Sequence, residues 1–340
     1  MARGKNERLV SLAHGSGGEE MRELITRLIL PRFDNPLLGA LGDSAIIDLP
    51  GEGRLAFTTD SYVIDPLFFP GGDIGYLSVC GTVNDLAVSG AVPRFISAGL
   101  IIEEGFPFRD LERVLDSMAR AAAEAGVKLV TGDTKVVARG AADKLFINTA
   151  GLGTVRPGIE LGAERCRAGD EIIVSGPVGS HGTAVVVARR DFGLETKLES
   201  DVAPLNSQTA ALLEVCPGTR MMRDPTRGGL AGVLCEIAGR AGLGIRLEES
   251  AVPMLEAVKE VCEILGFDPL YLANEGIFAA VVPAGESGRA VAALKRAGAG
   301  RAACIGKMAQ DDMQLVTVNT LVGGQRILSP LGGELLPRIC

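Results

Sequence analysis

The chain has 340 residues, of which 47% are apolar, and it carries a formal net charge of −8. This length and composition exclude general disorder and favour two packed domains over one. The acidic balance argues against a nucleic-acid or anionic-membrane surface, which needs clustered Lys and Arg, and no apolar run approaches the roughly 20 residues of a membrane span.

The N-terminus and the cysteines indicate the cellular location and argue against two kinds of stabilised fold. Residues 1–8 are polar and lack the apolar core of a signal peptide, so we expect a cytoplasmic protein. The seven cysteines form no C-x-x-C pair and accompany only two histidines, His14 and His181, which argues against a disulfide framework or a zinc site. We expect both histidines to be loop hydrogen-bonders and most cysteines to be core residues. Cys340 differs because it is the last residue.

Helical periodicity and strand-like apolar runs are mixed in both halves of the chain. Apolar residues recur at helical spacing in Ile74–Ser89, Phe108–Ala125, Gly229–Ala241, Pro253–Leu265 and Gly288–Ala297. Short apolar runs bounded by Gly, Pro or Asp predict strands at Ala45–Leu49, Arg54–Thr58, Phe95–Ile102, Leu145–Ala150, Glu171–Ser175 and Ile277–Val282. The mixture predicts an α/β (mixed α+β) fold.

A linker and a tail divide the chain. The segment Gly151–Gly169 is rich in Gly, Arg and Pro and breaks the periodicity, so we place a domain boundary near residue 157. The expected parts are an N-terminal domain (1–157), a C-terminal domain (158–320) and a tail (321–340). Two Gly pairs and two prolines give the tail a composition that resists helix and sheet, so we expect it to be flexible. Fully extended, it reaches up to roughly 65 Å.

A series of aspartates at strand ends and turns is the most informative pattern. Each is flanked by small residues, and the series comprises Asp43 in LGDSA, Asp60 in TTDS, Asp85 in VNDLA, Asp133 in TGDTK and Asp224 in RDPTRGGL. Mg²⁺ prefers hard oxygen ligands and usually bridges a few carboxylates to substrate phosphates, so the series suits a metal-nucleotide site. Any one of them alone is better explained as a turn or cap residue. Their number favours the site.

One glycine-rich segment could bind phosphate, but the two common nucleotide-binding glycine motifs are missing from the sequence. The glycine-rich segment His14–Gly18 precedes a helix start and can present backbone N–H groups to a phosphate. Neither a P-loop nor a Rossmann glycine signature is present, so a nucleotide site must be built in another way.

These segments together resemble the HypE family of hydrogenase maturation proteins over essentially the whole chain. The matching motifs are HGSGGEEM, GDSA, TTDSYV, VNDLAVSGA, TGDTKVV, DPTRGGL, ANEG and the terminal PRIC. The aspartate motifs alone indicate the broader superfamily of aminoimidazole ribonucleotide synthetase, selenophosphate synthetase and thiamine-monophosphate kinase. The resemblance implies the two-domain, PurM-like fold of that superfamily, with ATP in the cleft between the domains and an N-terminal domain that pairs in a homodimer.

The resemblance also implies a chemistry. HypE proteins receive a carbamoyl group on the terminal cysteine from a HypF carbamoyltransferase and use ATP to dehydrate this thiocarbamate to a thiocyanate. The cyanide then passes to iron on a HypC and HypD complex, for the active site of nickel–iron (NiFe) hydrogenase. This implies ATP and Mg²⁺ as cofactors.

Site residues follow from the matching motifs. The resemblance implies metal ligation by Asp43, Asp60, Asp85 and Asp133, and a nucleotide-binding set that adds Asn84 and Asp224. Lys135 is expected near the phosphates or the carbamoyl oxygen, and otherwise is an exposed lysine beside a turn. Glu275, in a polar break before an apolar strand, is our expected base for removing protons from the carbamoyl nitrogen, and otherwise is a surface loop acid.

Cys340 poses a physical difficulty, because the adjacent terminal carboxylate disfavours a thiolate. We expect Arg338 to offset this charge. Two other functions stay open: a small-molecule kinase or synthetase of the same superfamily, or a non-catalytic carrier of the carbamoyl or cyano group.

Overall fold

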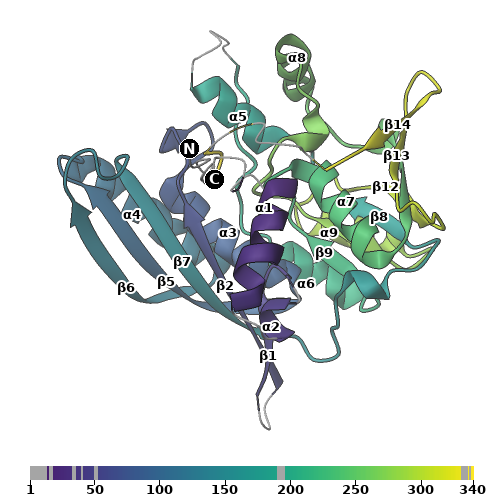
Figure 1. Cartoon of the computed structure of the whole chain (residues 1–340), viewed down its shortest axis with the longest axis horizontal. Helices are drawn as coiled ribbons and strands as arrows, with labels where there is room; N and C mark the ends of the chain where they lie inside the picture. Colours follow the sequence, from purple (N-terminus) through teal and green to yellow (C-terminus); the bar gives the residue numbers. More distant parts are fainter. Residues whose placement is uncertain are drawn as a thin grey trace, which may run out of the picture.

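The computed structural model of the chain describes residues 14, 18–32, 36–39, 41–49, 53–189, 196–330, 336 and 338–340. Two sheets, each with helices packed on it, lie side by side (Figure 1). Within the described residues, every helix is too short or too polar to cross a membrane.

The first sheet has five strands in the order β1-β2-β7-β5-β6. Its strands are β1 (Ala45–Leu49), β2 (Gly53–Tyr62), β5 (Ala91–Glu103), β6 (Lys128–Val137) and β7 (Leu145–Val155). β5 and β6 are parallel and the other neighbours are antiparallel. Helices α3 (Ile74–Val88) and α4 (Phe108–Ala125) pack together, and α3 contacts β2, β5 and β7 across one face of this sheet. Asp73 caps α3 by accepting hydrogen bonds from the backbone N–H groups of Gly75 and Tyr76.

Short elements precede and connect these strands. They are α1 (Glu19–Leu24), a π-helical turn (Ile25–Ile29), a 3₁₀ turn (Leu30–Arg32), α2 (Pro36–Gly39), β3 (Phe68–Phe69) and β4 (Gly72–Asp73).

The second sheet has seven strands in the order β14-β13-β10-β12-β8-β11-β9. Its strands are β8 (Glu171–Val174), β9 (Met221–Arg223), β10 (Gly244–Glu248), β11 (Ala279–Val282), β12 (Ala303–Ala309), β13 (Val316–Asn319) and β14 (Gln325–Leu328). The helices of this half are α5 (Ser180–Ala188), α6 (Asn206–Val215), α7 (Gly229–Ala241), α8 (Glu256–Leu265) and α9 (Ser287–Arg296), with 3₁₀ turns at Ala163–Arg165, Glu249–Ala251 and Pro269–Tyr271.

The helices and strands expected from the sequence are confirmed, with shifts of a few residues at their ends. The end of α4 is where the sequence predicts it, because Gly126 takes the left-handed conformation at φ 69° that stops the helix. The predicted linker is wrong at its start, since β7 continues to Val155. The reason is packing: a Cβ on Gly151 would lie 2.6 Å from the Thr82 side chain and 2.9 Å from that of Leu86. Glycine is there to let α3 approach the strand.

The tail is also more ordered than its composition predicts. β14 lies inside it and pairs antiparallel with β13, so the inference that this segment resists sheet is wrong. Its first Gly pair makes the hairpin turn instead: Gly323 has φ +84°, and the backbone N–H of Thr320 donates to the Gly324 carbonyl. Only residues beyond Leu328 can leave the sheet, which shortens the reach of the tail to about 40 Å.

Candidate active site at an acidic cluster

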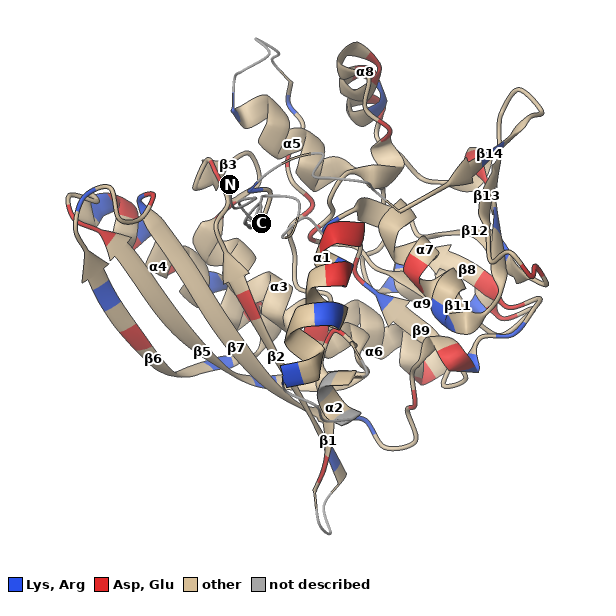
Figure 2. Ribbon diagram, viewed as in Figure 1, with Lys and Arg blue, Asp and Glu red and all other residues tan. Residues whose placement is uncertain are grey.

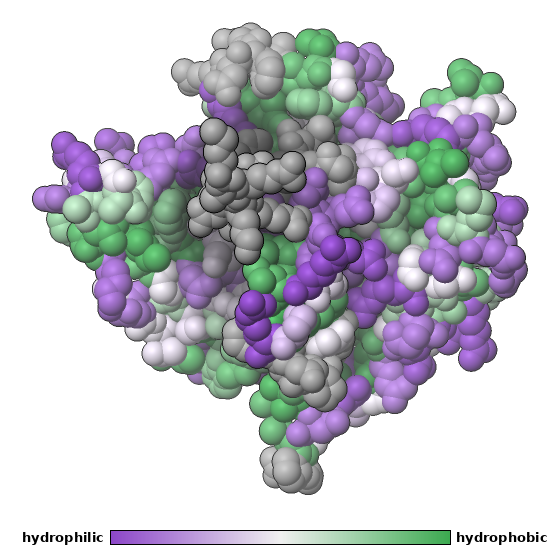
Figure 3. All heavy atoms as spheres, viewed as in Figure 1, coloured by the Kyte–Doolittle hydropathy of each residue, from purple (hydrophilic) through white to green (hydrophobic). Residues whose placement is uncertain are grey.

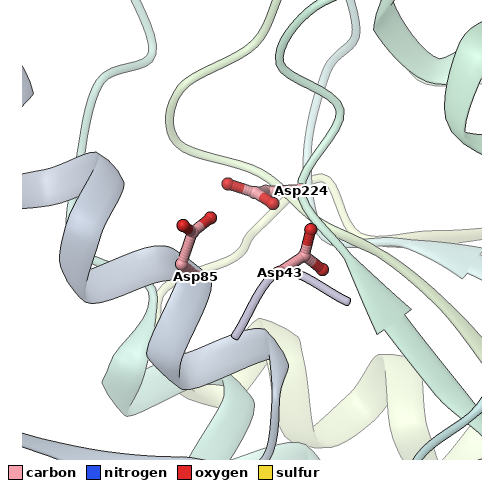
Figure 4. A group of neighbouring side chains, drawn as sticks. All are labelled: Asp43, Asp85 and Asp224. Carbon is pink, nitrogen blue, oxygen red and sulfur yellow. The ribbon is translucent and has the colours of Figure 1, made fainter. Parts of the chain in front are cut away.

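Three carboxylates from distant parts of the sequence meet between the two sheets. One oxygen of each of Asp43, Asp85 and Asp224 lies within 4.8 Å of the other two, and the side chains point toward one another (Figure 4). Asp85 comes from α3, Asp43 lies just before β1, and Asp224 directly follows β9. Both halves of the molecule therefore build this acidic cluster.

Burial dominates the electrostatics of the acidic cluster. It raises the pKa of all three carboxyl groups, and their mutual repulsion adds to the rise. Two neighbours act in the opposite direction: Arg223 Nε lies 2.8 Å from Asp43, and Thr58 Oγ1 donates a 2.7 Å hydrogen bond to Asp85. Dry carboxylates that repel one another favour a bound cation, and oxygen ligands of this kind fit Mg²⁺.

Asp60 lies at the margin of the acidic cluster. It is half-buried on β2, and its charge raises the pKa of all three cluster residues. Its carboxylate accepts a 3.1 Å hydrogen bond from the Tyr62 hydroxyl. The structure therefore brings four of the six predicted metal and nucleotide residues into one electrostatic neighbourhood.

Asn84 is buried where the two halves touch. Its amide donates to the carbonyls of Ala203 and Glu275, at 3.1 Å each, and accepts from the backbone N–H of Leu205 at 2.8 Å. These bonds use the polar atoms of the side chain to join α3 to the second half, so Asn84 positions the cluster helix.

Asp133 and Lys135 do not reach the acidic cluster within this chain. They pair with each other at 2.6 Å on the edge strand β6, with side chains 69% and 67% exposed. The register places Asp133 in one row with Gly99, Asn148 and Ser61. Asp60 is the neighbour of Ser61 and points to the opposite face of the sheet, because strand residues alternate.

Glu275 is buried rather than a surface loop acid. It is 2% exposed, its Oε1 has no hydrogen-bond partner, and burial raises its pKa well above the ordinary value, with Asp224 and Asp201 adding to the rise. The Asp201 carboxylate fixes this turn by accepting hydrogen bonds from the backbone N–H groups of Glu275 and Gly276. A Cβ on Gly276 would collide with the Asp201 carbonyl, so this turn requires glycine.

The chain terminus lies beside these groups. Ile339 is buried in the core of the first half, and the Cys340 carboxylate accepts a 3.1 Å hydrogen bond from the backbone N–H of Val63. The charge of Cys340 is the largest cause of a raised pKa at Arg227, to which Asp60 and Glu275 also contribute. Cys340 therefore belongs to the same electrostatic neighbourhood as the acidic cluster.

The cation that faces Cys340 is not the one expected. Arg338 instead pairs with Asp143 and donates to the Val63 carbonyl. Arg227, within the motif RDPTRGGL, provides the positive charge. Sequence reasoning used that motif only for its aspartate. The segment His14–Gly18 falls largely outside the described residues, so its predicted phosphate contact stays a prediction.

Comparison with known proteins agrees with this geometry. The AIR synthase related protein models match at residues 41–155 (N-terminal domain) and 167–319 (C-terminal domain). The carbamoyl dehydratase HypE of Azotobacter vinelandii is 48% identical over 332 residues, which cover 97% of each chain. The chain belongs to the HypE family. The PurM-like fold is thereby confirmed.

Solved HypE structures are similar over nearly the whole chain. HypE in a HypE–HypF complex has 45% identity and a TM-score of 0.86, covering 91% of this chain and 99% of that one. A hydrogenase maturation protein HypE in complex with ATP has 46% identity and a TM-score of 0.81, covering 98% and 100%.

Proposed function

We propose that the chain serves NiFe hydrogenase maturation by dehydrating an S-carbamoyl group on its own Cys340 to a thiocyanate, with consumption of ATP. The observation that carries this proposal is that Cys340, Asp60 and Glu275 all raise the pKa of Arg227, and that the Cys340 carboxylate accepts a hydrogen bond from Val63, just after the strand that carries Asp60. Two comparisons support it: relatives are named carbamoyl dehydratase, and a solved HypE holds ATP.

The reaction balances in two steps. The carbamoyl oxygen attacks the γ-phosphorus of ATP and releases ADP, while one proton leaves the nitrogen. Expulsion of phosphate with loss of the second N–H proton then forms the C≡N bond. The oxygen of the removed water therefore leaves in inorganic phosphate, and its two hydrogens leave as the N–H protons.

The acidic cluster would hold the metal in this scheme. Asp43, Asp85 and Asp224 are the ligands, and Asp60 at the margin is a further one. Bound Mg²⁺ supplies positive charge against the phosphates during transfer. Arg227 holds its positive charge beside Cys340, where negative charge develops on the activated group.

Glu275 is suited to take the protons. Burial raises its pKa, so the ionised carboxylate is a stronger base than that of an exposed glutamate. The unpartnered Oε1 leaves one oxygen available to an N–H donor. Asp201 fixes the backbone of the turn through two N–H groups, so the carboxylate is aimed by main-chain geometry.

Lys135 and Asp133 take part from a second copy of the chain. The outer face of the first sheet carries a cross-strand row of Phe57, Leu152 and Phe95, each about two-fifths exposed. At the left of Figure 3, where Figure 1 has this sheet, a hydrophobic patch lies between hydrophilic areas, and in Figure 2 the strands there are mostly tan apart from charged segments on β6. Such a face favours a symmetric dimer, in which β6 of one copy brings these two residues to the cluster of the other.

The wider partners follow from the family. HypF would load the carbamoyl group, as the HypE–HypF complex of a relative suggests, and a HypC and HypD complex would receive the cyanide.

Mass analysis of Cys340 tests the proposal. The chain, carbamoylated by a HypF protein, should lose the mass of one water when given ATP and Mg²⁺. Glu275→Gln should slow this loss at least about 100-fold while the thermal shift on nucleotide binding is kept. Glu214→Gln, an exposed glutamate on α6, is the matched control and should react normally.

Each alternative has its own outcome. A carbamoylated parent that consumes no ATP would be a carrier. A Cys340→Ser variant that turns over a free small molecule at the parent rate would be a kinase or synthetase. Undiminished water loss by Glu275→Gln would remove that residue from the mechanism.

A further inference from the structure

The last three residues are held through their main chain as well as through the buried Ile339 side chain and the Arg338 contacts with Asp143 and Val63. The backbone N–H of Val63 donates to the Cys340 carboxylate at 3.1 Å, and that of Asp65 donates to the Arg338 carbonyl at 3.2 Å. The pairing of 63 with 340 and 65 with 338 is an antiparallel register. The terminus therefore lies antiparallel to the residues that follow β2.

His181 completes this contact from the second half of the molecule. Its Nε2 lies 2.7 Å from the carbonyl of Ile339, the residue whose carbonyl falls between the two that the residues after β2 bind. Because a carbonyl only accepts, Nε2 carries the proton, and Nδ1 accepts from the Ser200 hydroxyl at 2.7 Å. Burial lowers the pKa of His181 to about 4, which keeps the ring neutral and in this tautomer.

His181 is not the loop residue that its sequence suggests. It is fully buried in the first turn of α5, and its ring meets Phe69 edge-on at 5.4 Å between centroids. The buried imidazole donates its hydrogen bond to the C-terminal segment, and in the proposed function this segment leaves the site to meet other proteins.

Arg189 adds a second side-chain donor. Its Nη2 donates to the Arg338 carbonyl at 2.9 Å, and its Nε donates to the Asp65 carbonyl at 2.9 Å. All three terminal carbonyl groups, at 338, 339 and 340, thus accept hydrogen bonds from the folded body.

We propose that Val63, Asp65, His181 and Arg189 form a binding site for the C-terminal tripeptide, in which His181 and Arg189 are positioning residues that set how often Cys340 is docked. This terminus-binding site reads main-chain carbonyls, so it sets the register of the terminus by backbone position. The inference deepens the proposed function, since only a docked Cys340 lies beside the acidic cluster.

The site predicts how the terminus exchanges between docked and undocked states. Undocking breaks four hydrogen bonds to the terminal carbonyls and leaves the donors of the buried His181 and the partly buried Arg189 to water. Removing one donor should shift the balance toward the undocked state without touching the acidic cluster.

Alkylation of Cys340 measures docking in the full chain without ATP. Iodoacetamide labelling, resolved by peptide mass spectrometry, gives the rate at Cys340 relative to the half-buried Cys304 in the same molecule. His181→Phe keeps an aromatic ring but removes the donor, and should raise the Cys340 rate about fivefold. His181→Gln restores an N–H donor and should stay within about twofold of the parent. Arg189→Met provides an independent variant and should act like His181→Phe.

Amide hydrogen exchange supplies the second readout. The N–H groups of Val63 and Asp65 should exchange faster in His181→Phe and Arg189→Met, while the Cys304 rate and the melting temperature stay near the parent values. Parent-like Cys340 alkylation in both folded variants would overturn the terminus-binding site. Because neither measurement needs turnover, that result would leave the proposed dehydration standing.

Discussion

The three carboxylates of the acidic cluster destabilise the metal-free protein. Burial raises the pKa of Asp43 to about 8 and that of Asp224 to about 6, so both bind protons more tightly in the folded chain than in the unfolded one. A group of this kind stabilises fully below its unfolded pKa, and the contribution is lost as the pH rises through the folded pKa. The metal-free protein should therefore lose stability between about pH 4 and pH 8.

Asp224→Asn tests whether the ionised carboxylates of the acidic cluster destabilise the metal-free protein. It removes one repelling charge and should raise the free energy of unfolding at pH 8 by about 1–2 kcal/mol, with a smaller gain at pH 5. The same change should abolish the rise in melting temperature that Mg²⁺ and ATP give the parent. Urea unfolding at both pH values and a thermal scan measure the two effects.

Asp170→Asn is the contrasting control, because this buried carboxylate is paired with Arg220 at 3.3 Å. It should lower stability by about 1–3 kcal/mol and leave the Mg²⁺ response intact. A destabilised Asp224→Asn that still responds to Mg²⁺ would show that the cluster is no metal site.

Local sequence motifs reveal some of the site residues but not those that act through long-range contacts. Each cluster aspartate stands in a short motif of small residues, so it was found without coordinates. Asp201 acts on Glu275 from 74 positions away and His181 on Ile339 from 158, and no local pattern marks such contacts. The tripeptide site was invisible for that reason, although its residues are ordinary ones.

At the scale of elements, the packing of α3 against β7 decides how the cluster helix sits. Gly151→Ala should cost about 1–3 kcal/mol in the free energy of unfolding, because its Cβ would lie 2.6 Å from the Thr82 side chain. Gly300→Ala is the matched control, since nothing lies within 4 Å of its Cβ, and it should be close to neutral. Chemical unfolding of both variants measures the difference. Equal stabilities would mean that α3 can shift to accommodate the extra Cβ without loss of stability.

The same glycine explains an error in predicting elements. Glycine usually interrupts a strand, so the sequence predicts a linker at the end of β7, whereas close helix packing requires glycine inside the strand. Gly126 caused no such error because it stands after a clearly periodic helix. The division of the chain near residue 157 remains a prediction, in the interval between β7 and β8.

At the scale of the whole molecule, one chain supplies most but not all of the expected site. The motif TGDTK predicted that Asp133 and Lys135 act with the other aspartates, and they lie on the opposite face of the sheet from Asp60. A sequence shows which residues share a motif set but not which copy of the chain brings them together. The exposed row of Phe57, Leu152 and Phe95 on that face connects the two observations.

Mixing two inactive variants tests whether the site is shared. In a dimer that brings Lys135 of one copy to the Glu275 site of the other, Lys135→Ala and Glu275→Ala are each inactive alone. Random pairing gives half heterodimers, each with one complete site, so the mixture should recover about a quarter of the parent rate of thiocarbamate dehydration. Mixing either variant with itself is the control. A mixture that stays inactive although mass measurement shows heterodimers would place both residues in one chain's reaction. Phe95→Lys, at the β5 end of the apolar row, should give monomers by light scattering and prevent recovery.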